Sequence, residues 1–406
     1  MSSNAGFLRS PQAIYFGEGQ RFALAPVAAA LGRKVLVCTD ERLAADPQFI
    51  ELMGHLEAAG LQARVYDRTQ AELPIGGVLE CVAQARNFAP DVVVGIGGGS
   101  CMDMAKLVSL LLARGGDLAD YYGELKVPGP ILPVIALPTT SGTGSEVTAV
   151  AVVADDRRDL KVGVSSPHLI PHAAICDPEL TYSCPPMLTA CCGADALTHA
   201  IEAFTAVRRQ ADADLATGRV FVGKNELTDV HALTAIRLLA LHLRRAVENG
   251  RDPQARAGVM RAALHAGLAF GTAGTAAAHA IQYPVGALTH TGHAVGVAVL
   301  LPYVMAFNRA ACASEFAQIA TAMGQQGTDE GALADSAIHA VQRLFADVGI
   351  PSTLQALGVP ADALPAVAEQ SMLAARLVNN NPRPLDEAAI LRIARAAHQG
   401  SLSLAA

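Results

Sequence analysis

The sequence predicts an α/β fold with a doubly wound parallel sheet in the first half of the chain and an all-helical fold in the second half. From residue 34 to about 180, short β-branched runs alternate with helix-length amphipathic stretches, the pattern of a parallel sheet covered on both faces. After Pro185 and Pro186, long Ala- and Leu-rich segments carry apolar residues at helical spacing. We therefore expect one domain over residues 1–185 and a second over residues 186–406.

Each element is expected where a run of one pattern is bounded by turn residues. In the first half, strands are expected at 34–40, 63–68, 91–97, 133–138, 148–155 and 173–178. The helices of that half are expected at 42–59, 75–88 and 100–114. In the second half, helices are expected at 187–206, 226–248, 254–271, 275–284, 293–312, 329–347 and 361–376.

The composition describes a globular protein and excludes two classes of partner. The 406 residues exceed what one hydrophobic core usually supports, and hydrophobic residues make up 51% of them against 17% charged residues. A net charge of −7, without a dense Lys/Arg stripe, argues against nucleic acid. The apolar runs are broken before bilayer-spanning length, and MSSNAGFLRS lacks the pattern of a signal peptide. A cytoplasmic protein is expected.

A glycine-rich turn follows the third expected strand. The segment VVVGIGGGSCMDMAK (92–106) runs from a buried strand through Gly97, Gly98 and Gly99 to Ser100, and then into a helix. Glycines let a backbone approach an anion closely, Ser100 can cap the helix, and the N–H groups of a helix N-terminus favour negative charge. The segment therefore predicts a phosphate site, although a tight turn without a ligand has the same pattern.

A second polar loop supports a dinucleotide at the same sheet edge. PTTSGTGSE (138–146) follows another buried strand, and its hydroxyl groups include those of Thr139, Thr140 and Thr143. Two such loops at the C-terminal ends of parallel strands place a ligand crevice between them. The usual G-x-G-x-x-G fingerprint is absent after the first strand, which leads instead to Asp40. Asp40 would bind an adenosine ribose and favour NAD over NADP, or it would cap the next helix.

Acidic and imidazole side chains with metal-ligand spacing occur in the helical half. Asp195 and His199 in GADALTHAIEAF (193–204) are four residues apart and project from the same helix face, as ordinary surface pairs also do. The otherwise apolar stretch 279–296 adds His279, His290 and His293. Together with Asp195 and His199, His279 and His293 could form a site of three histidines and one aspartate, with room for a substrate oxygen.

Four motifs occur in order along the chain: GGGSxxDxAK (97–106), PTTSGTGSE, GADALTHAIE and the segment from His279 to His293. As an ordered set that covers essentially the whole chain, they resemble the iron-containing (group III) alcohol dehydrogenase family. The resemblance implies an N-terminal nucleotide-binding α/β domain and a C-terminal all-helical metal domain. It also implies hydride transfer between a nicotinamide cofactor and a small alcohol or aldehyde.

The resemblance also assigns roles to individual residues. The metal ligands would be Asp195, His199, His279 and His293. The cofactor would contact Gly98, Gly99 and Ser100 at the pyrophosphate, Thr139 and Thr140 on the adenosine side, and Asp103 and Lys161 near the nicotinamide ribose. Fe(II) is the metal that the resemblance favours, whereas affinity order alone would favour Zn(II).

One position departs from the family pattern. Tyr283 stands where many members have a second histidine, four residues after the third ligand, which puts the usual proton-relay residue in doubt. The Tyr-Pro pair also resembles the hydroxyacid-oxoacid transhydrogenase branch, in which a retained cofactor carries hydride between two substrates. Dehydroquinate synthase and glycerol-1-phosphate dehydrogenase share the two-domain plan, but few Lys or Arg residues stand beside the expected ligands to bind a phosphate. A homodimer or larger homo-oligomer is expected.

Overall fold

The computed structural model describes residues 6–155, 160–210 and 212–406. The chain divides into two compact units. One unit consists of residues 9–183 and 216–220, and the other contains 184–215, 221–406 and the described residues up to Leu8. Among the described residues, no helix is both long and apolar enough to cross a membrane.

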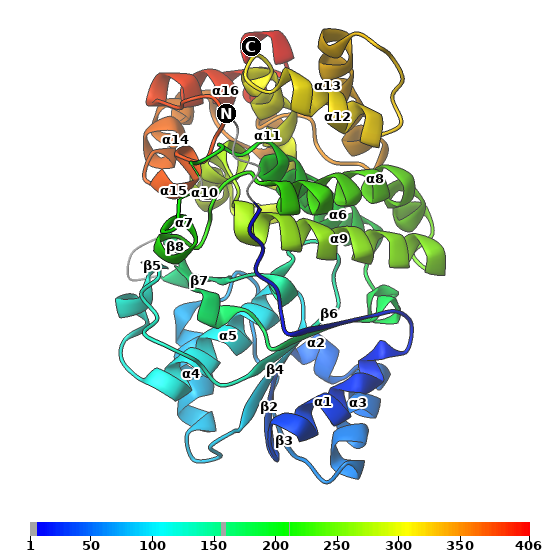
Figure 1. Ribbon diagram of the computed structural model, residues 1–406, viewed down its shortest axis with the longest axis vertical. Coiled ribbons are helices and arrows are strands. Elements are labelled where there is room, and N and C mark those ends of the chain that lie inside the picture. The colour runs from blue at the N-terminus through cyan, green and yellow to red at the C-terminus, as the bar shows by residue number, and fades with distance from the viewer. Residues whose placement is uncertain (1–5, 156–159, 211) are drawn as a thin grey trace. The chain divides into compact units, whose positions relative to one another are not determined.

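A six-stranded parallel sheet forms the centre of the first unit, with the strand order β1-β9-β6-β4-β2-β3. Figure 1 labels β6, β4, β2 and β3 of this sheet. Every pair of neighbours in this sheet is parallel. The strands are β1 (Ala13–Phe16), β2 (Lys34–Cys38), β3 (Gln62–Tyr66), β4 (Val92–Gly97), β6 (Val134–Pro138) and β9 (Ala173–Cys176). The helices of the unit are α1 (Leu24–Leu31), α2 (Glu41–Ala44), α3 (Pro47–Ala58), α4 (Ile75–Ala85) and α5 (Gly99–Arg114). The predicted doubly wound α/β fold is confirmed.

Alternating side chains of the central strands enter two separate cores. On β2, Val35 and Val37 belong to the core that contains residues of α1 and α3. Leu36 and Cys38, on the opposite face of β2, belong to the core that contains residues of α4 and α5. Both faces of the sheet are therefore covered by helices, which is why the strands β4 and β6 are buried throughout.

The segment expected as a strand at 148–155 belongs to a second, smaller sheet. Here β7 (Val150–Asp155) pairs antiparallel with β8 (Leu160–Ser165), and β8 pairs with β5 (Gly123–Glu124). The alternating burial of β7 fits this mixed sheet and differs from the uniformly buried β4. Strand β1 was not expected; it has only four residues, which is short for a strand, and it lies at the edge of the sheet.

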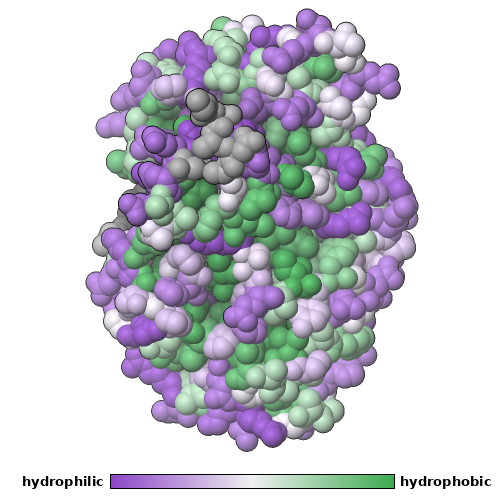
Figure 2. All heavy atoms as spheres, viewed as in Figure 1, coloured by the Kyte–Doolittle hydropathy of each residue, from purple (hydrophilic) through white to green (hydrophobic). Residues whose placement is uncertain are grey.

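The second unit consists of helices, and α6 (Pro186–Thr205) lies at its centre. Every residue of α6 from Cys192 to Thr205 is buried. Helices α8, α9 and α11 pack against α6. Hydrophilic and hydrophobic residues are intermixed on the face of the molecule that Figure 2 shows. The other helices are α7 (Leu215–Gly218, which the division places partly in each unit), α8 (Glu226–Glu248), α9 (Pro253–Ala273), α10 (Ala277–Thr289), α11 (His293–Asn308), α12 (Ala313–Ala322), α13 (Glu330–Asp347), α14 (Leu364–Ser371), α15 (Ala375–Val378) and α16 (Glu387–Gln399).

Some helices differ from the expected ranges. The helix expected at 293–312 ends at Asn308, because the Asn308 carbonyl accepts hydrogen bonds from the N–H groups of Ala311 and Cys312 and so closes α11. Helix α12, which begins at Ala313, was not expected. The helix expected at 42–59 is divided into α2 and α3 by a new cap at Asp46. Helix α16 was not expected, although Asp386 caps its N-terminus.

Candidate functional site

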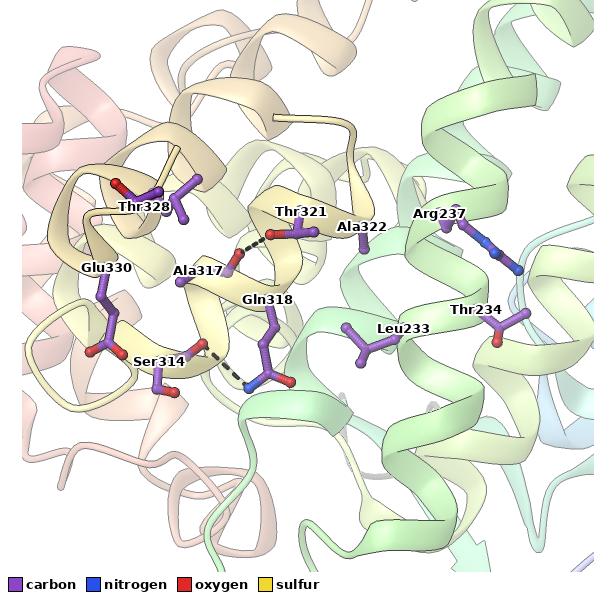
Figure 3. Close-up of a pocket in the computed structure, with 11 residues that line it drawn as sticks. Leu233, Thr234, Arg237, Ser314, Ala317, Gln318, Thr321, Ala322, Thr328 and Glu330 are labelled. Carbon is purple, nitrogen blue, oxygen red and sulfur yellow. Dashed lines mark hydrogen bonds between the residues drawn. The ribbon is translucent and has the colours of Figure 1, made fainter. Parts of the chain in front are cut away.

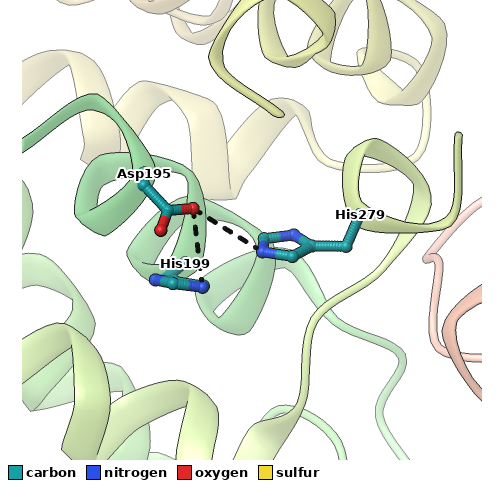
Figure 4. Close-up of side chains that lie close together, drawn as sticks. All are labelled: Asp195, His199 and His279. Carbon is teal, nitrogen blue, oxygen red and sulfur yellow. Dashed lines mark ion pairs between the residues drawn. The ribbon is translucent and has the colours of Figure 1, made fainter. Parts of the chain in front are cut away.

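Helix α6 places Asp195 and His199 one turn apart on the same buried face. Asp195 Oδ1 lies 3.7 Å from His199 Nε2 and 3.8 Å from His279 Nε2, which comes from α10 (Figure 4). The three ligand atoms lie within 4.8 Å of one another, and among the described residues this is the one group of three such side chains. These separations are too long for hydrogen bonds. They are close to the roughly 3.4 Å between two ligands that hold one ion tetrahedrally at about 2.1 Å.

Two atoms in this group have unsatisfied bonding capacity. Within the described part of the chain, the buried atoms Asp195 Oδ1 and His279 Nε2 have no hydrogen-bond partner. Burial is also the main reason that the pKa of Asp195 rises to about 7. Buried polar atoms are normally satisfied, so two that face each other indicate a cation as the missing partner. The imidazole of His199 is held by stacking on Phe270, with ring centroids 4.0 Å apart.

The fourth predicted ligand lies beside this group. His293 begins α11, and its ring centroid is 5.3 Å from that of His279. Tyr283 follows one turn after His279 on α10, and its ring centroid is 6.5 Å from that of His293. Burial raises the pKa of the Tyr283 hydroxyl. His290 is exposed and ends α10 in a left-handed conformation.

A buried acidic residue that the sequence does not mark as a site residue, Glu202, contacts one of the predicted ligands. Its carboxylate is buried, and Oε2 lies 2.6 Å from His279 Nδ1. The same carboxylate accepts hydrogen bonds from the backbone N–H groups of Ala276 and Ala278. The sequence does contain a signal, because Glu202 is three residues after His199 and therefore on a neighbouring part of the same helix face.

In the other unit, the glycine-rich turn brings backbone and side chains into close contact. Gly97 has a φ of 151°, and a Cβ atom there would lie 2.5 Å from Cys101 Sγ. A Cβ atom at Gly99 would lie 2.8 Å from Thr143 Cγ2 in the second polar loop. The expectation that Ser100 caps α5 was wrong. The helix begins at Gly99 with Gly98 as its cap residue, which places Ser100 inside the first turn.

Hydrogen bonds from the buried Lys106 connect the motif at 97–106 with the segment that contains the second polar loop. Lys106 Nζ donates hydrogen bonds to Ser145 Oγ, at 2.9 Å, and to the Val150 carbonyl oxygen, at 2.8 Å. Burial lowers the pKa of Lys106 to about 8, while the nearby Asp103 and Glu146 act against that decrease. Asp103 accepts hydrogen bonds from Ser145 Oγ and the Val152 N–H group. The motif at 97–106 and the motif at 138–146 therefore form one connected structure.

The remaining predicted cofactor residues lie at strand ends or in the same loops. Asp40 follows β2, and its Oδ1 accepts a hydrogen bond from the Leu43 N–H group, so it does cap α2. Lys161 lies on β8 and forms an ion pair with Glu72. Thr139 follows β6 directly, and the buried Thr140 Oγ1 has no hydrogen-bond partner among the described residues.

Two family models together match most of the chain. A family model described as iron-containing alcohol dehydrogenase matches residues 11–178. A second, described as the C-terminal part of the Fe-containing alcohol dehydrogenase family, matches residues 189–398. The chain belongs to the iron-containing alcohol dehydrogenase family.

Individual members of the family match over nearly the whole chain. Long-chain-alcohol dehydrogenase 1 of Geobacillus thermodenitrificans is 38% identical over 399 residues, which cover 97% of this chain and 96% of that relative. The structure of a 1,3-propanediol oxidoreductase matches with a TM-score of 0.90 at 34% identity and covers 97% of this chain and 100% of that one. Sulfoacetaldehyde reductase from Bifidobacterium kashiwanohense, solved in complex with NAD+, matches with a TM-score of 0.83 at 27% identity and covers 97% and 99%.

A surface pocket of the helical unit is separate from these family motifs. It has a volume of about 650 Å3 and lies among α8, α12 and α13. Figure 3 shows Arg237 and Glu330 at its edges, together with the hydrogen bond that Thr321 Oγ1 donates to the Ala317 carbonyl oxygen. None of the site residues predicted from the sequence lines this pocket.

Proposed function

We propose that this chain is a metal-dependent alcohol dehydrogenase, which transfers hydride between NAD(H) and a small alcohol or aldehyde. The observation that carries the proposal is the convergence of Asp195, His199 and His279, in a chain of this family. By their names, the relatives oxidise alcohols or reduce aldehydes, sulfoacetaldehyde among them. A small alcohol or aldehyde is therefore the substrate class that we propose.

The buried donor atoms fit a divalent transition metal. One carboxylate oxygen and the imidazole nitrogens suit Fe(II) and Zn(II), and we propose Fe(II) because of the family. Asp195, His199, His279 and His293 would hold the ion. When bound, the metal supplies Lewis acidity that lowers the pKa of an alcohol and polarises an aldehyde.

The loops around Gly97 fit a dinucleotide. Gly98 and Gly99 carry no side chain where the backbone must come close to a pyrophosphate, and Gly99 and Ser100 lie in the first turn of α5, where N–H groups lack helical partners. Thr140 Oγ1 is a buried hydroxyl available to the same ligand. We propose that Thr139, Thr140 and Thr143 contact the cofactor, and that Asp103 and Lys161 lie near its nicotinamide ribose.

We propose NAD rather than NADP. Capping α2 uses Asp40 Oδ1. Its second oxygen can still accept a hydrogen bond from a ribose hydroxyl, and its charge would repel a 2′-phosphate. The two interpretations of Asp40, a helix cap and a ribose ligand, are therefore compatible.

The residues around the ligands have separate tasks in the proposed reaction. Asp195, His199 and His279 orient the reacting oxygen through the site they form. A tyrosine hydroxyl ordinarily carries its proton at neutral pH, and burial raises the pKa of Tyr283 further, so we propose that Tyr283 acts as a hydrogen-bonding group. We propose that the alcohol proton leaves through water, with Tyr283 or the exposed His290 on its route.

An assay of cofactor and substrate use tests this proposal. The purified protein, loaded with Fe(II), is mixed with NADH or NADPH and a series of short aldehydes, and cofactor absorbance is followed. We expect oxidation of NADH with at least one aldehyde, at least about tenfold faster than oxidation of NADPH, because about 1.4 kcal/mol of charge repulsion suffices for that factor. Faster oxidation of NADPH would contradict the assignment of Asp40.

Tyr283 favours a second candidate, the hydroxyacid-oxoacid transhydrogenase, which the same assay separates. A transhydrogenase would show no net oxidation of added NADH and would turn over only when a hydroxy acid and an oxo acid are both supplied. That result would replace the dehydrogenase proposal.

The cytoplasmic location and the homodimer or larger homo-oligomer stay predictions.

A further inference from the structure

Three nitrogen atoms lie within hydrogen-bond distance of the buried carboxylate of Glu202. Oε2 accepts a hydrogen bond from the Ala276 N–H group at 2.8 Å, and Oε1 accepts one from the Ala278 N–H group at 2.7 Å. His279 Nδ1 is 2.6 Å from Oε2. A carboxylate at this place is an acceptor only, so His279 Nδ1 must carry the hydrogen of this contact.

This contact fixes the chemical state of the other imidazole nitrogen. A neutral imidazole with its hydrogen on Nδ1 has a lone pair on Nε2. His279 Nε2 is the atom that points at Asp195 Oδ1, 3.8 Å away. The nitrogen that faces the proposed metal therefore has the lone pair that a ligand requires.

The same carboxylate also fixes the position of the His279 ring. Ala276 is the cap residue of α10 and makes no side-chain capping hydrogen bond. Instead, Glu202 of α6 accepts hydrogen bonds from the N–H groups of Ala276 and Ala278 at the start of α10. Its negative charge is also favourable at a helix N-terminus. The two helices that provide Asp195, His199 and His279 are thus joined at this one buried side chain.

We propose that Glu202 is a positioning residue for the metal site, which orients His279 and holds its proton on Nδ1 without binding the metal or the substrate. The inference rests on the proposed metal-dependent function and extends it to a residue outside the ligand set. Carboxylates that accept a hydrogen bond from a ligating histidine commonly contribute a factor of about 10 to 100 to metal affinity. A role in capping alone would stabilise α10 but would leave the histidine tautomer free.

The variant Glu202→Gln separates these roles because an amide keeps the size of the side chain but has one acceptor oxygen and a donor NH2 group. Whichever way the amide is turned, its NH2 group faces at least one of the three N–H donors. If the NH2 group takes the place of Oε2, it opposes Ala276 and His279, and the conflict at His279 is relieved only if the proton moves from Nδ1 to Nε2, which then cannot bind a metal. If the NH2 group takes the place of Oε1, it opposes Ala278, and His279 Nδ1 donates to a neutral oxygen in place of a carboxylate, which holds the ring less strongly. The matched control is Thr205→Val on the same helix, which removes another buried hydrogen bond, from Thr205 Oγ1 to the Ile201 carbonyl oxygen.

The measurement is the dissociation constant of Co(II) for the metal-free protein, obtained by competition with a chelator, together with the visible spectrum of the Co(II) complex. We expect Glu202→Gln to weaken Co(II) binding by about 10 to 100 times and to change the spectrum, and Thr205→Val to alter neither. NADH affinity, measured by fluorescence, should stay within about twofold in both variants, because the cofactor loops belong to the other unit.

Unchanged Co(II) affinity and spectrum in folded Glu202→Gln would overturn the proposal. If that variant does not fold, Glu202→Asp decides: its carboxylate is one methylene shorter, so weaker Co(II) binding supports the proposal and wild-type binding contradicts it. Absence of Co(II) binding by the wild-type protein would instead contradict the proposed function and is distinguishable from a failure of the role of Glu202.

Discussion

Replacing Asp195 or His279 with alanine is expected to abolish turnover and to leave the fold and NADH affinity largely intact. Each change removes one of the two buried atoms that face each other without a hydrogen-bond partner among the described residues. The Lewis-acid contribution that depends on them is several kcal/mol, so turnover should fall at least about a thousandfold. Turnover is measured by NADH absorbance, metal content by elemental analysis, and NADH binding by fluorescence.

The matched control for these variants is His231→Ala. His231 lies on α8 and contacts His265 of α9, so it tests the loss of a half-buried imidazole from the same unit. We expect this variant to keep its metal and its activity. Retained activity in both Asp195→Ala and His279→Ala would show that these residues do not hold a catalytic metal.

Lys106→Met is expected to cause the second largest loss, in the cofactor site. Methionine has a similar length but removes a buried charge beside Asp103 and all the hydrogen bonds that Lys106 donates to Ser145, Thr148 and Val150. Removing one partner of a buried charged pair typically costs about 3 to 5 kcal/mol. We expect the thermal midpoint of the protein to fall and NADH affinity to drop at least about tenfold, since 1.4 kcal/mol corresponds to that factor.

The metal site provides the internal reference for Lys106→Met. Because the ligands belong to the other unit, the variant should retain wild-type metal content at a temperature where it stays folded. Lys34→Met removes a half-buried lysine at the start of β2 and should leave NADH affinity unchanged. Wild-type NADH affinity in Lys106→Met would mean that the two polar loops keep their shape without this lysine.

The sequence predicted the architecture where hydrophobic patterns are long and uniform. Strand β4 is apolar throughout, and α6 has apolar residues all along its length, so both were recognisable. Strand β7 was expected, but its place in a second sheet was not, because a strand pattern does not say which sheet a strand joins. Its partner β8 was not expected. Helix α16 was not expected, although its apolar residues recur at helical spacing after the capping Asp386.

The sequence predicted the candidate ligand residues but not the residues that hold the site in place. Asp195 and His199 are four residues apart, so helical geometry alone places them together. Glu202 contacts the start of α10 only in the folded protein, because Ala276 is 74 residues away from it in the sequence. Lys106 likewise contacts residues 39 to 44 positions away, and a sequence motif gives no indication that a lysine will be buried.

The most direct test of the central claim is the return of activity when metal is added to a chelator-stripped sample. The protein is freed of metal, assayed with NADH and an aldehyde that the untreated protein reduces, and then titrated with Fe(II) or Zn(II). We expect no turnover before the addition and restoration that saturates at one metal ion per chain, with Asp195→Ala not restored. Full activity of the metal-free protein, or equal restoration of Asp195→Ala, would contradict a catalytic metal at Asp195, His199 and His279.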